Sequence, residues 1–395
     1  MSKILIVSQH YYPENFRITD IAEELVKKGH MVTVLTGYPN YPQGYVLDDY
    51  KGRSGKKKHK EETINGVHIL RCYEHPRKHS KIHLFLNYYS ISLSMRSKAR
   101  HLKEKFDVVL INQLSPVMQS WGGILYAKKH NIKSILYCYD LWPDSLAAGG
   151  IKENSLIYKY YYKVSNKIYK NVDEILVTSK NFINYFENKH HISSDKLYYL
   201  PQYCEDLFNN IEPIIQLKEF NYVFAGNIGN VQSVETIIKA ASLIKKDNTI
   251  KIHIVGDGSD FSNCKKLANE LKLNNVIFYG KRPLEEMPTF YSMASAMLVT
   301  LSNNDVISNT LPGKVQSYMC AGKPIIASAN GETKTIIKEA KCGVCCSAED
   351  YIELAKLMTV FKNLNQKELS INSRSYYNLH FNKELFFKTL EERLK

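Results

Sequence analysis

Cysteine in paired or clustered positions is nearly absent from this sequence. Eight cysteines occur among 395 residues, and the one C-x-x-C pair, Cys342 and Cys345, has neither a second pair nor nearby histidines to complete a zinc site. The other thiols are scattered, some of them within apolar runs, as in a reduced cytosolic protein. We therefore expect no zinc site and no disulfide framework, with a thioredoxin-like role for the pair as a less favoured alternative.

Long apolar runs are also missing. No stretch approaches the ~20 apolar residues that a membrane-spanning helix needs. Met1–Lys3 leads directly into a strand-like run, Ile4–Val7, in place of a signal peptide. These absences predict a cytoplasmic protein that touches the inner face of the cytoplasmic membrane only peripherally.

Several catalytic motifs are absent from the positions where they would indicate an active site. The chain has no H-E-x-x-H, no P-loop, no G-x-S-x-G and no D-x-D pair in such a place. Without a D-x-D pair, the charge of a bound diphosphate has to be met by lysine, arginine and helix N-termini instead of a divalent ion. We expect a site with no metal and no cofactor.

Acidic residues are few in one part of the chain. Residues 51–100 contain 13 Lys and Arg against 3 Asp and Glu, and residues 1–200 carry most of the net charge of +14. This imbalance favours an anionic partner such as a membrane surface or a lipid diphosphate. The alternative is a solvated basic face in a lysine-rich protein. Nucleic acid is the least favoured partner, because the basic stretch lacks a recognisable binding module.

Apolar runs of strand length alternate with helical patterns through both halves of the chain. The runs are rich in Val, Ile and Leu on consecutive positions, which is typical of strands buried on both faces of a parallel sheet. Strands are predicted at 4–8, 31–36, 67–71, 108–112, 134–139 and 174–178, then at 222–225, 250–255, 276–279, 297–301 and 324–328. Repeated β-α units of this kind predict an α/β fold with doubly wound sheets.

The alternation is interrupted once, near residues 203–220. This stretch mixes charge, Asn and one Pro without clear periodicity. We interpret it as a linker between two Rossmann-like domains, an N-terminal one at 1–205 and a C-terminal one at 215–380.

Glycine and cationic residues gather in the loops after the strands of the second half. Ligands of doubly wound sheets bind beyond the carboxyl ends of the strands, where glycine lets the backbone approach and a helix N-terminus attracts phosphate. Any one of these loops alone is also an ordinary tight turn, and Lys314 alone is an ordinary surface lysine. Together they favour a nucleotide-diphosphate site, with candidates Gly226, Asn227, Gly229, Gln232, Gly256, Lys281, Arg282, Pro312, Gly313 and Lys314.

Acidic and aromatic residues follow strands of the first half. Asp140 and Asp144 stand in a loop stiffened by a Trp and a Pro, which suits a catalytic site, although Asp140 could equally cap the next segment. The aromatic loops Tyr11–Glu14 and Tyr38–Gly44 offer sugar-binding groups, and are equally suited to holding loops in place.

The basic stretch of the first half is followed by an apolar one. Lys51–Lys60 contains six Lys and Arg, and Ile82–Met95 is apolar and aromatic with further basic residues behind it. A basic loop beside an apolar helix is typical of peripheral contact with an anionic membrane. The alternative is a helix that packs its apolar face on the sheet and exposes its basic face to solvent.

These stretches resemble the glycosyltransferases of family four, which have the GT-B fold. The resemblance is strongest to the branch that builds bacterial O-antigen and capsule repeats, including L-N-acetylfucosamine transferases. It is carried by Ile4–Asp20, Gly29–Gly44, Asp140–Ser145, Ala225–Gly229 and Pro312–Pro324.

The resemblance implies two Rossmann-like domains that face a cleft, with the acceptor on the first, the nucleotide sugar on the second, and the terminal helix 381–395 returning to the first. It implies a retaining, metal-independent transferase of the EC 2.4 class. Such an enzyme would move a sugar, such as an N-acetylated deoxysugar, from a UDP-sugar to a lipid-linked surface-polysaccharide precursor. Asp140 and Lys314 are the expected catalytic residues. Substrate-binding residues would include Glu14, Asn15 and Ser317 besides those of the glycine-containing loops.

The sequence departs from the family pattern at three positions. Family members often have two glutamates eight residues apart, where this chain has Asn309 and Ser317, and Gln232 stands near an expected lysine. Ser317 could still hydrogen-bond a ribose hydroxyl. These departures motivate one alternative, a catalytically degenerate, membrane-associated scaffold in polysaccharide assembly. A separate alternative is a nucleotide-sugar epimerase of the same fold.

Overall fold

The structure is a computed structural model that describes residues 1–51, 58–77, 80–148, 150–212 and 219–395. Part of the basic stretch, residues 52–57, lies outside the described residues. The chain divides into two compact units. The first unit comprises residues 1–178, 182–200 and 389–395, and the second comprises residues 179–181 and 201–388. The interpretation from the sequence placed the change of domain between 205 and 215, and assigned 381–395 to the first domain.

The first unit contains an eight-stranded sheet in the order β3-β4-β2-β1-β5-β6-β7-β8. All neighbouring strands are parallel except β3 and β4. The strands are β1 (Lys3–Val7), β2 (Met31–Gly37), β3 (Glu61–Ile64), β4 (Val67–Cys72), β5 (Val108–Gln113), β6 (Lys133–Cys138), β7 (Glu174–Val177) and β8 (Leu197–Tyr199). Six of them coincide with predicted strands, while the short edge strands β3 and β8 were not predicted.

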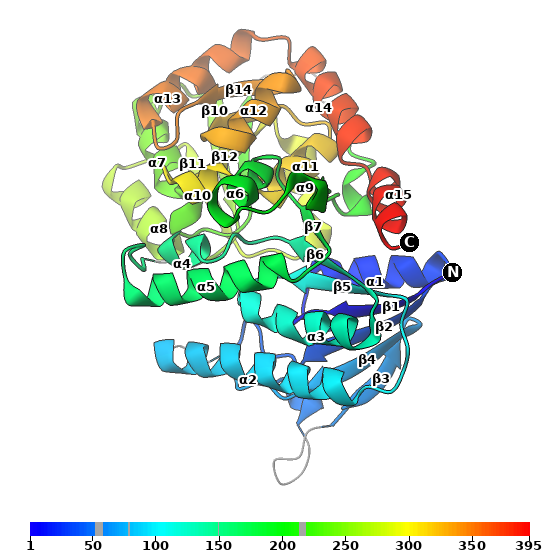
Figure 1. The fold of residues 1–395 in the computed structure, drawn as a ribbon. Coiled ribbons are helices and arrows are strands. Elements are labelled where there is room, and N and C mark those ends of the chain that lie inside the picture. The colour runs from blue at the N-terminus through cyan, green and yellow to red at the C-terminus, as the bar shows by residue number, and fades with distance from the viewer. Residues whose placement is uncertain (52–57, 78–79, 149, 213–218) are drawn as a thin grey trace. The chain divides into compact units, whose positions relative to one another are not determined.

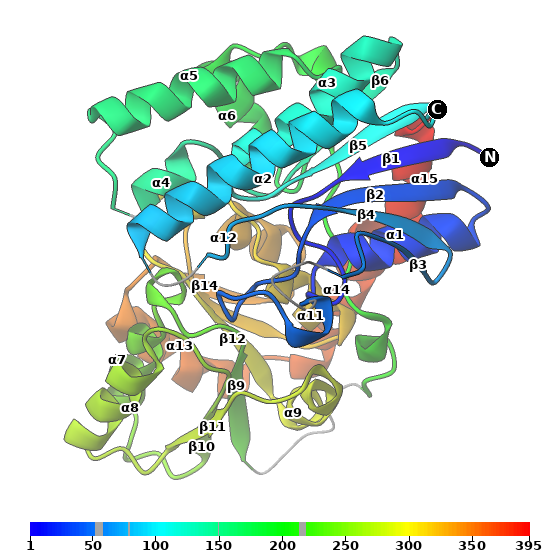
Figure 2. The same ribbon diagram turned by 90° about the horizontal axis from the view of Figure 1, so that it is seen from below.

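Helices cover both faces of this sheet. Helices α2 (Lys81–His101), α3 (Trp121–His130) and α5 (Leu156–Lys170) lie on one face, as Figure 2 shows. They bury apolar residues against it. Helix α1 (Arg17–Lys27) lies on the opposite face. The last residues of the chain join the first unit, where Glu391 accepts a hydrogen bond from His30 at 3.1 Å. The remaining helices of this part are α4 (Asp144–Ala148) and α6 (Asn181–His190).

The second unit contains a six-stranded, fully parallel sheet in the order β11-β10-β9-β12-β13-β14. Figure 1 labels four of these strands, β10, β11, β12 and β14. This is the Rossmann order 3-2-1-4-5-6, which has its topological switch between β9 and β12. The strands are β9 (Phe220–Ala225), β10 (Ile250–Val255), β11 (Val276–Gly280), β12 (Ala296–Thr300), β13 (Ile325–Ser328) and β14 (Gly343–Cys346). Only β14 was not predicted from the sequence.

Helices cover both faces of the second sheet as well, which makes it doubly wound. Helices α7 (Val234–Leu243), α8 (Phe261–Glu270) and α13 (Tyr351–Val360) share one apolar core. Helices α9 (Met287–Met293), α11 (Gly313–Cys320), α12 (Gly331–Glu339) and α14 (Gln366–His380) share the other. The predicted terminal helix is in fact preceded by α14, so the chain ends in two helices, α14 and α15 (Lys383–Arg393).

The order of strands directs attention to the same place in each unit. In the first unit the order reverses between β1 and β5, and in the second between β9 and β12. Loops that leave the carboxyl ends of strands at such a switch are where doubly wound proteins bind their ligands. The loops after β1, β5, β9 and β12 therefore lie at these switches, next to the loops that follow the neighbouring strands.

Candidate active site

Backbone hydrogen bonds join the loops at the carboxyl edge of the second sheet. The amide of Gly226, after β9, donates to the carbonyl of Val255 at 2.9 Å, and the amide of Ile228 donates to Asp257 at 2.9 Å. The amide of Gly256, after β10, donates to the carbonyl of Gly280 at 2.9 Å. Three successive loops thus form one continuous backbone surface.

Gly256 shows why this surface requires glycine. Its φ angle is +141°, a backbone conformation that residues with a side chain rarely adopt. A Cβ atom there would lie 1.8 Å from the carbonyl oxygen of Gly226. The two glycine-containing loops predicted from the sequence can therefore approach this closely only because neither carries a side chain at the contact.

Lys314 reaches from the first turn of α11 to this surface. Its Nζ atom lies 3.8 Å from the centroid of the Phe224 ring, and a Cβ atom on Gly226 would lie 3.0 Å from it. Nζ is buried and has no hydrogen-bond partner among the described residues. Burial lowers the pKa of Lys314 to about 7. A cation buried without an anion is costly, so its position is best explained by a ligand that brings negative charge.

Two helix N-termini open at the same edge of the sheet. Helix α11 begins at Gly313 after Pro312, and no side chain caps its first amides. Helix α7 begins after Ser233, whose φ of 42° is left-handed, and it likewise has no side-chain cap. Uncapped first turns present N–H groups and the positive end of the helix dipole, which suits a phosphate group.

The other predicted donor-side residues differ in their surroundings. Asn227 donates to the side chain of Gln232 at 3.1 Å, and Thr300, at the end of β12, donates to the backbone carbonyl of Gln232 at 2.6 Å. Gln232 thus ties the loop after β9 to the end of β12. Gly229, in the same loop, lies close to this pair: a Cβ atom there would be 3.1 Å from the Asn227 side chain.

Ser317 and Arg282 contact residues of their own segments. The Ser317 hydroxyl donates to the carbonyl of Gly313 at 3.2 Å, one turn earlier in α11. Lys281 and Arg282 are exposed, and Arg282 forms an ion pair with Glu286 at 3.8 Å. Lys314, by contrast, is buried against Gly226 of the loop after β9.

In the first unit, Asp140 follows β6 and is held by the loop after β5. The amide and the hydroxyl of Ser115 donate to its Oδ2 atom at 3.1 and 3.0 Å. The Trp142 ring nitrogen donates to the Ser115 hydroxyl at 2.8 Å and so fixes that hydroxyl. Burial raises the pKa of Asp140, and the two hydrogen bonds from Ser115 oppose this. The carboxyl is therefore rigidly placed and only partly compensated, as in many acid-base and charge-stabilising roles.

Asp144 has a different environment from Asp140, although both lie in the predicted loop. Its carboxylate accepts hydrogen bonds from Tyr158 at 2.7 Å and from Tyr185, and Lys189 lies 2.5 Å from it. With both oxygens occupied by residues of α5 and α6, Asp144 ties helices together.

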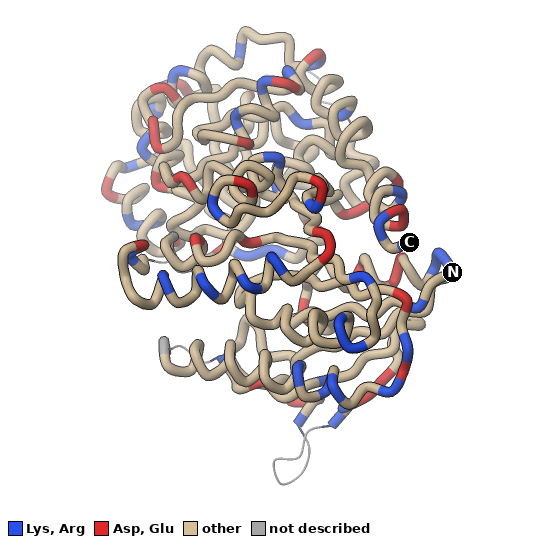
Figure 3. The backbone as a smooth tube through the Cα atoms, in the orientation of Figure 1, with Lys and Arg blue, Asp and Glu red and all other residues tan. Residues whose placement is uncertain are grey.

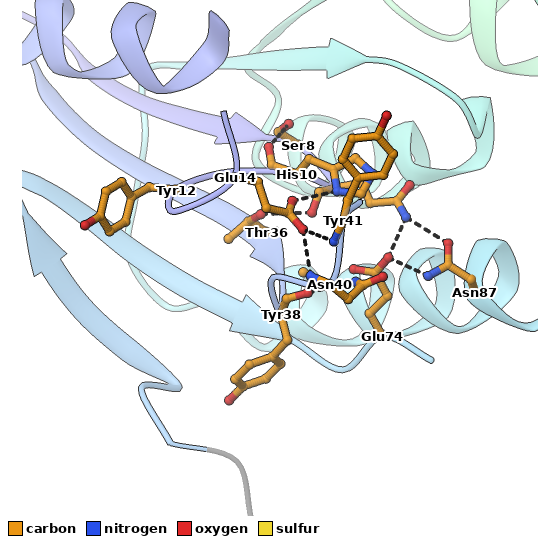
Figure 4. A network of polar contacts seen from close by, with 12 residues as sticks. Ser8, His10, Tyr12, Glu14, Thr36, Tyr38, Asn40, Tyr41, Glu74 and Asn87 are labelled. Carbon is orange, nitrogen blue, oxygen red and sulfur yellow. Dashed lines mark hydrogen bonds and ion pairs between the residues drawn. The ribbon is translucent and has the colours of Figure 1, made fainter. Parts of the chain in front are cut away.

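Glu14 is the centre of a buried network at the carboxyl ends of β1 and β2 (Figure 4). Its carboxylate accepts the amides of Asn40 and Tyr41 at 2.7 and 2.6 Å, and His10 Nδ1 lies 2.7 Å from its other oxygen. These contacts make Glu14 a residue that positions the two aromatic loops. Asn15, the next residue, is exposed.

The structure adds residues to this network that were not selected from the sequence. Glu74 is fully buried and accepts hydrogen bonds from Gln9 at 2.5 Å and from Asn87 at 2.7 Å (Figure 4). Burial raises the pKa of Glu74. Its position two residues after β4 was the available signal, because carboxylates near the ends of parallel strands gather at one edge.

No helix within the described ranges is long and apolar enough to cross a membrane. Among the same residues, no group of three or more His, Cys, Asp or Glu side chains is arranged to hold a metal ion.

Comparison with known protein families assigns each half of the chain. Residues 16–202 match the family described as Glycosyltransferase Family 4. Residues 209–376 match Glycosyl transferases group 1. The two matches are adjacent; the first includes Asp140, and the second includes the glycine loops and Lys314.

Individual proteins give the same assignment. The chain is 26% identical to the probable glycosyltransferase WbjE of Pseudomonas aeruginosa, over 77% of this chain and 78% of that protein. It is 22% identical to the putative colanic acid biosynthesis glycosyl transferase WcaI of Escherichia coli K12, over 84% of each. The solved structure of Anabaena HepE in complex with UDP has a TM-score of 0.71 at 12% identity, over 99% of each chain, and so shares the fold.

Both family matches, the named relatives and the two doubly wound parallel sheets agree with the resemblance found in the sequence. The chain belongs to the glycosyltransferases of family four and has the GT-B fold.

Proposed function

We propose that the chain transfers a sugar from a UDP-sugar to a lipid-linked precursor of a bacterial surface polysaccharide, with retention of configuration and without a metal ion. The observation that carries the donor half is the unpaired, buried ammonium of Lys314 against the glycine loops. Support for the acceptor class comes from relatives, one of which is named for colanic acid biosynthesis. Support for uridine comes from HepE, whose structure contains UDP.

In the proposed chemistry, the second unit stabilises the diphosphate of the donor. Negative charge grows on the diphosphate as the glycosidic bond breaks. Lys314 and the first amides of α7 and α11 are already directed at one edge of the sheet, so they can stabilise that charge without rearranging. Because cation and dipoles meet the charge, the proposed mechanism needs no divalent ion.

Asp140 is assigned to the acceptor side of the reaction. Its Oδ2 atom is fixed by Ser115, so the carboxylate can orient an acceptor hydroxyl or stabilise positive charge on the sugar in the transition state. Asp144 takes no part, because its oxygens are occupied by two tyrosines and a lysine.

The decisive experiment is calorimetric titration with nucleotides in the presence of a chelator. We expect UDP to bind in EDTA, with an affinity that added Mg²⁺ changes by less than about twofold, and CDP, ADP and GDP to bind more weakly. Failure of every nucleoside diphosphate to bind, or binding only with Mg²⁺, would contradict the proposal. A screen of UDP-sugars by thermal stabilisation then selects the donor, because a ligand at about 100 times Kd stabilises the fold by about 2.7 kcal/mol.

A second measurement separates transfer from the alternatives. The selected UDP-sugar is incubated with the protein, with and without a membrane extract that contains lipid-linked saccharides. Transfer predicts label in the lipid fraction only when extract is present. An isomerised sugar from donor alone would indicate an epimerase, and tight binding with neither product would indicate a scaffold.

A further inference from the structure

Helix α2 is apolar on two faces, and only one of them packs against the sheet. Tyr88, Ile91, Met95 and Ala99 form the stripe that is buried in the core of the first unit. A second stripe, at the same helical spacing, remains exposed: Ile82, Phe85, Leu86 and Leu93 have 73%, 51%, 42% and 58% of their surface exposed. An apolar face on the outside of a helix predicts a further contact.

The exposed stripe of α2 continues onto α5. The Phe85 ring lies 4.4 Å from that of Tyr89, and the Tyr89 hydroxyl donates to the hydroxyl of Tyr160 on α5 at 3.1 Å. In the first turn of α5, Leu156 and Ile157 are 85% and 56% exposed. Figures 1 and 2 both show the amino-terminal ends of the two helices on the same side of the first unit. Their exposed apolar residues therefore form one surface, which we call the α2–α5 surface.

Both helices carry charge of one sign only. Neither contains an Asp or Glu, while α2 has Arg96, Lys98 and Arg100, and α5 has Lys159, Lys163, Lys167 and Lys170. Figure 3 shows the basic positions repeating along α5. Tyrosine and phenylalanine beside lysine and arginine are the residue types that prefer the boundary between lipid tails and anionic headgroups.

The α2–α5 surface adjoins the network at the edge of the first sheet. Asn87 of α2 bonds to Glu74, and the Tyr88 ring lies 6.0 Å from Trp142, which holds Ser115 against Asp140. A surface in contact with lipid here would place the Asp140 loop near the membrane. An acceptor attached to a lipid could then reach it without leaving the bilayer.

We propose that the α2–α5 surface docks on an anionic membrane, with its apolar end in the headgroup boundary and its lysines against acidic headgroups. Charge favours this occupant over a second copy of the chain. A two-fold contact through this surface would bring two helix pairs of the same sign together, and like charges repel. The inference concerns where the protein binds lipid and does not depend on the proposed donor or reaction.

The test is sedimentation of the full-length protein with vesicles. We expect binding to vesicles of phosphatidylethanolamine with 30% phosphatidylglycerol, no measurable binding to phosphatidylcholine alone, and a marked loss of binding in 0.5 M NaCl. The triple variant Phe85→Ser/Leu156→Ser/Ile157→Ser should lower the partition coefficient about tenfold or more, because the apolar contribution scales with buried area. The double variant Lys159→Gln/Lys163→Gln should lower it on anionic vesicles.

A matched control uses exposed apolar residues of the second unit. Leu243, Ile352 and Leu379 are 55%, 51% and 68% exposed, and the variant Leu243→Ser/Ile352→Ser/Leu379→Ser should bind vesicles as the wild type does. Equal binding of wild type and the α2–α5 variants would overturn the inference, as would a dimer in ultracentrifugation that the first triple variant converts to a monomer. Unchanged midpoints of urea unfolding show that the variants fold, and keep this result separate from the donor-site result.

Discussion

The ammonium of Lys314 lies 3.8 Å from the centroid of the Phe224 ring, buried and with no acceptor among the described residues. The ring face offers the cation a weak partial stabilisation. This leaves most of the cost of burying the charge uncompensated until an anion arrives. The pair therefore links three properties of the donor site: its affinity for diphosphate, its dependence on pH, and the stability of the empty protein.

Lys314→Met should weaken UDP binding by about 10- to 100-fold, the loss typical of one charged hydrogen bond. The empty variant should be at least as stable as wild type, because an uncompensated buried cation has been removed. Isothermal titration calorimetry measures the affinity and urea unfolding measures the stability. The matched control is Lys334→Met, a helix lysine of α12. Equal effects of the two substitutions on UDP affinity would contradict the assignment of Lys314.

UDP binding should also take up protons at Lys314. Burial lowers its pKa from 10.5 to about 7, so the free protein carries a partly neutral amine above pH 7, while the bound diphosphate favours the ammonium. Between about pH 7 and 10 we expect net proton uptake, seen as a binding enthalpy that depends on the buffer. Because the unfolded chain holds this proton more tightly than the folded chain, unliganded stability should rise with pH across the same range, by at most about 1.4 kcal/mol per pH unit. A buffer-independent enthalpy in wild type, or the same uptake in Lys314→Met, would exclude Lys314 as the group that titrates.

Asp140→Asn should abolish transfer while leaving the fold at least as stable. Burial raises the pKa of this carboxyl, so the folded chain holds the proton more tightly than the unfolded chain does. Stability from the protonated form is lost as pH rises through the folded pKa, and at neutral pH the buried charge is a cost. Asparagine keeps an oxygen for Ser115 without the charge, so the melting temperature at pH 7 should stay the same or rise. A clear loss of stability with activity retained would show that Asp140 is structural.

Asp144→Asn should have the opposite effect. The change removes a charge that Lys189 neutralises and that two tyrosines hydrogen-bond, leaving a poorly paired ammonium between α5 and α6. We expect a loss of about 3 kcal/mol in urea unfolding, with UDP affinity unchanged because Asp144 lies in the first unit. The two acids of one loop are thus distinguished by which property each variant loses.

The sequence predicted the long central strands because parallel strands buried on both faces are continuous runs of Val, Ile and Leu, as in β1 and β5. It did not predict β3, whose sequence is Glu-Glu-Thr-Ile, or β8, which has three residues. Both are edge strands of the first sheet, where one side of the strand remains unpaired and no apolar run is required. Their pairing is decided by the neighbouring strand and not by their own composition.

The sequence predicted which loops form the candidate site, but not which of their residues contact one another. Strand ends followed by Gly, Lys and Asp pointed to the regions around Gly226, Lys314 and Asp140. The approach of Lys314 to Phe224 joins residues 90 positions apart, and the bonds of Glu14 join two separate loops, so neither could be read from local pattern. Asp140 and Asp144 stand four residues apart in the same predicted loop. Nothing in the sequence distinguished Asp140, which a serine holds, from Asp144, which two tyrosines enclose.

Two glycines with left-handed backbone conformations offer a test of the loop contact at the donor edge. Gly256 and Gly280 have φ angles of +141° and +68°, but a Cβ atom on Gly256 would lie 1.8 Å from the Gly226 carbonyl oxygen, whereas one on Gly280 meets nothing within 4 Å. Gly280→Ala should therefore cost only backbone strain of about 1 kcal/mol. Gly256→Ala adds a clash that must push the loops after β9 and β10 apart, so it should cost several kcal/mol in urea unfolding or reduce UDP affinity at least tenfold. Since both variants place a methyl group on a strand-end glycine, equal effects on UDP affinity and stability would mean that the close contact of these loops is not what shapes the donor site.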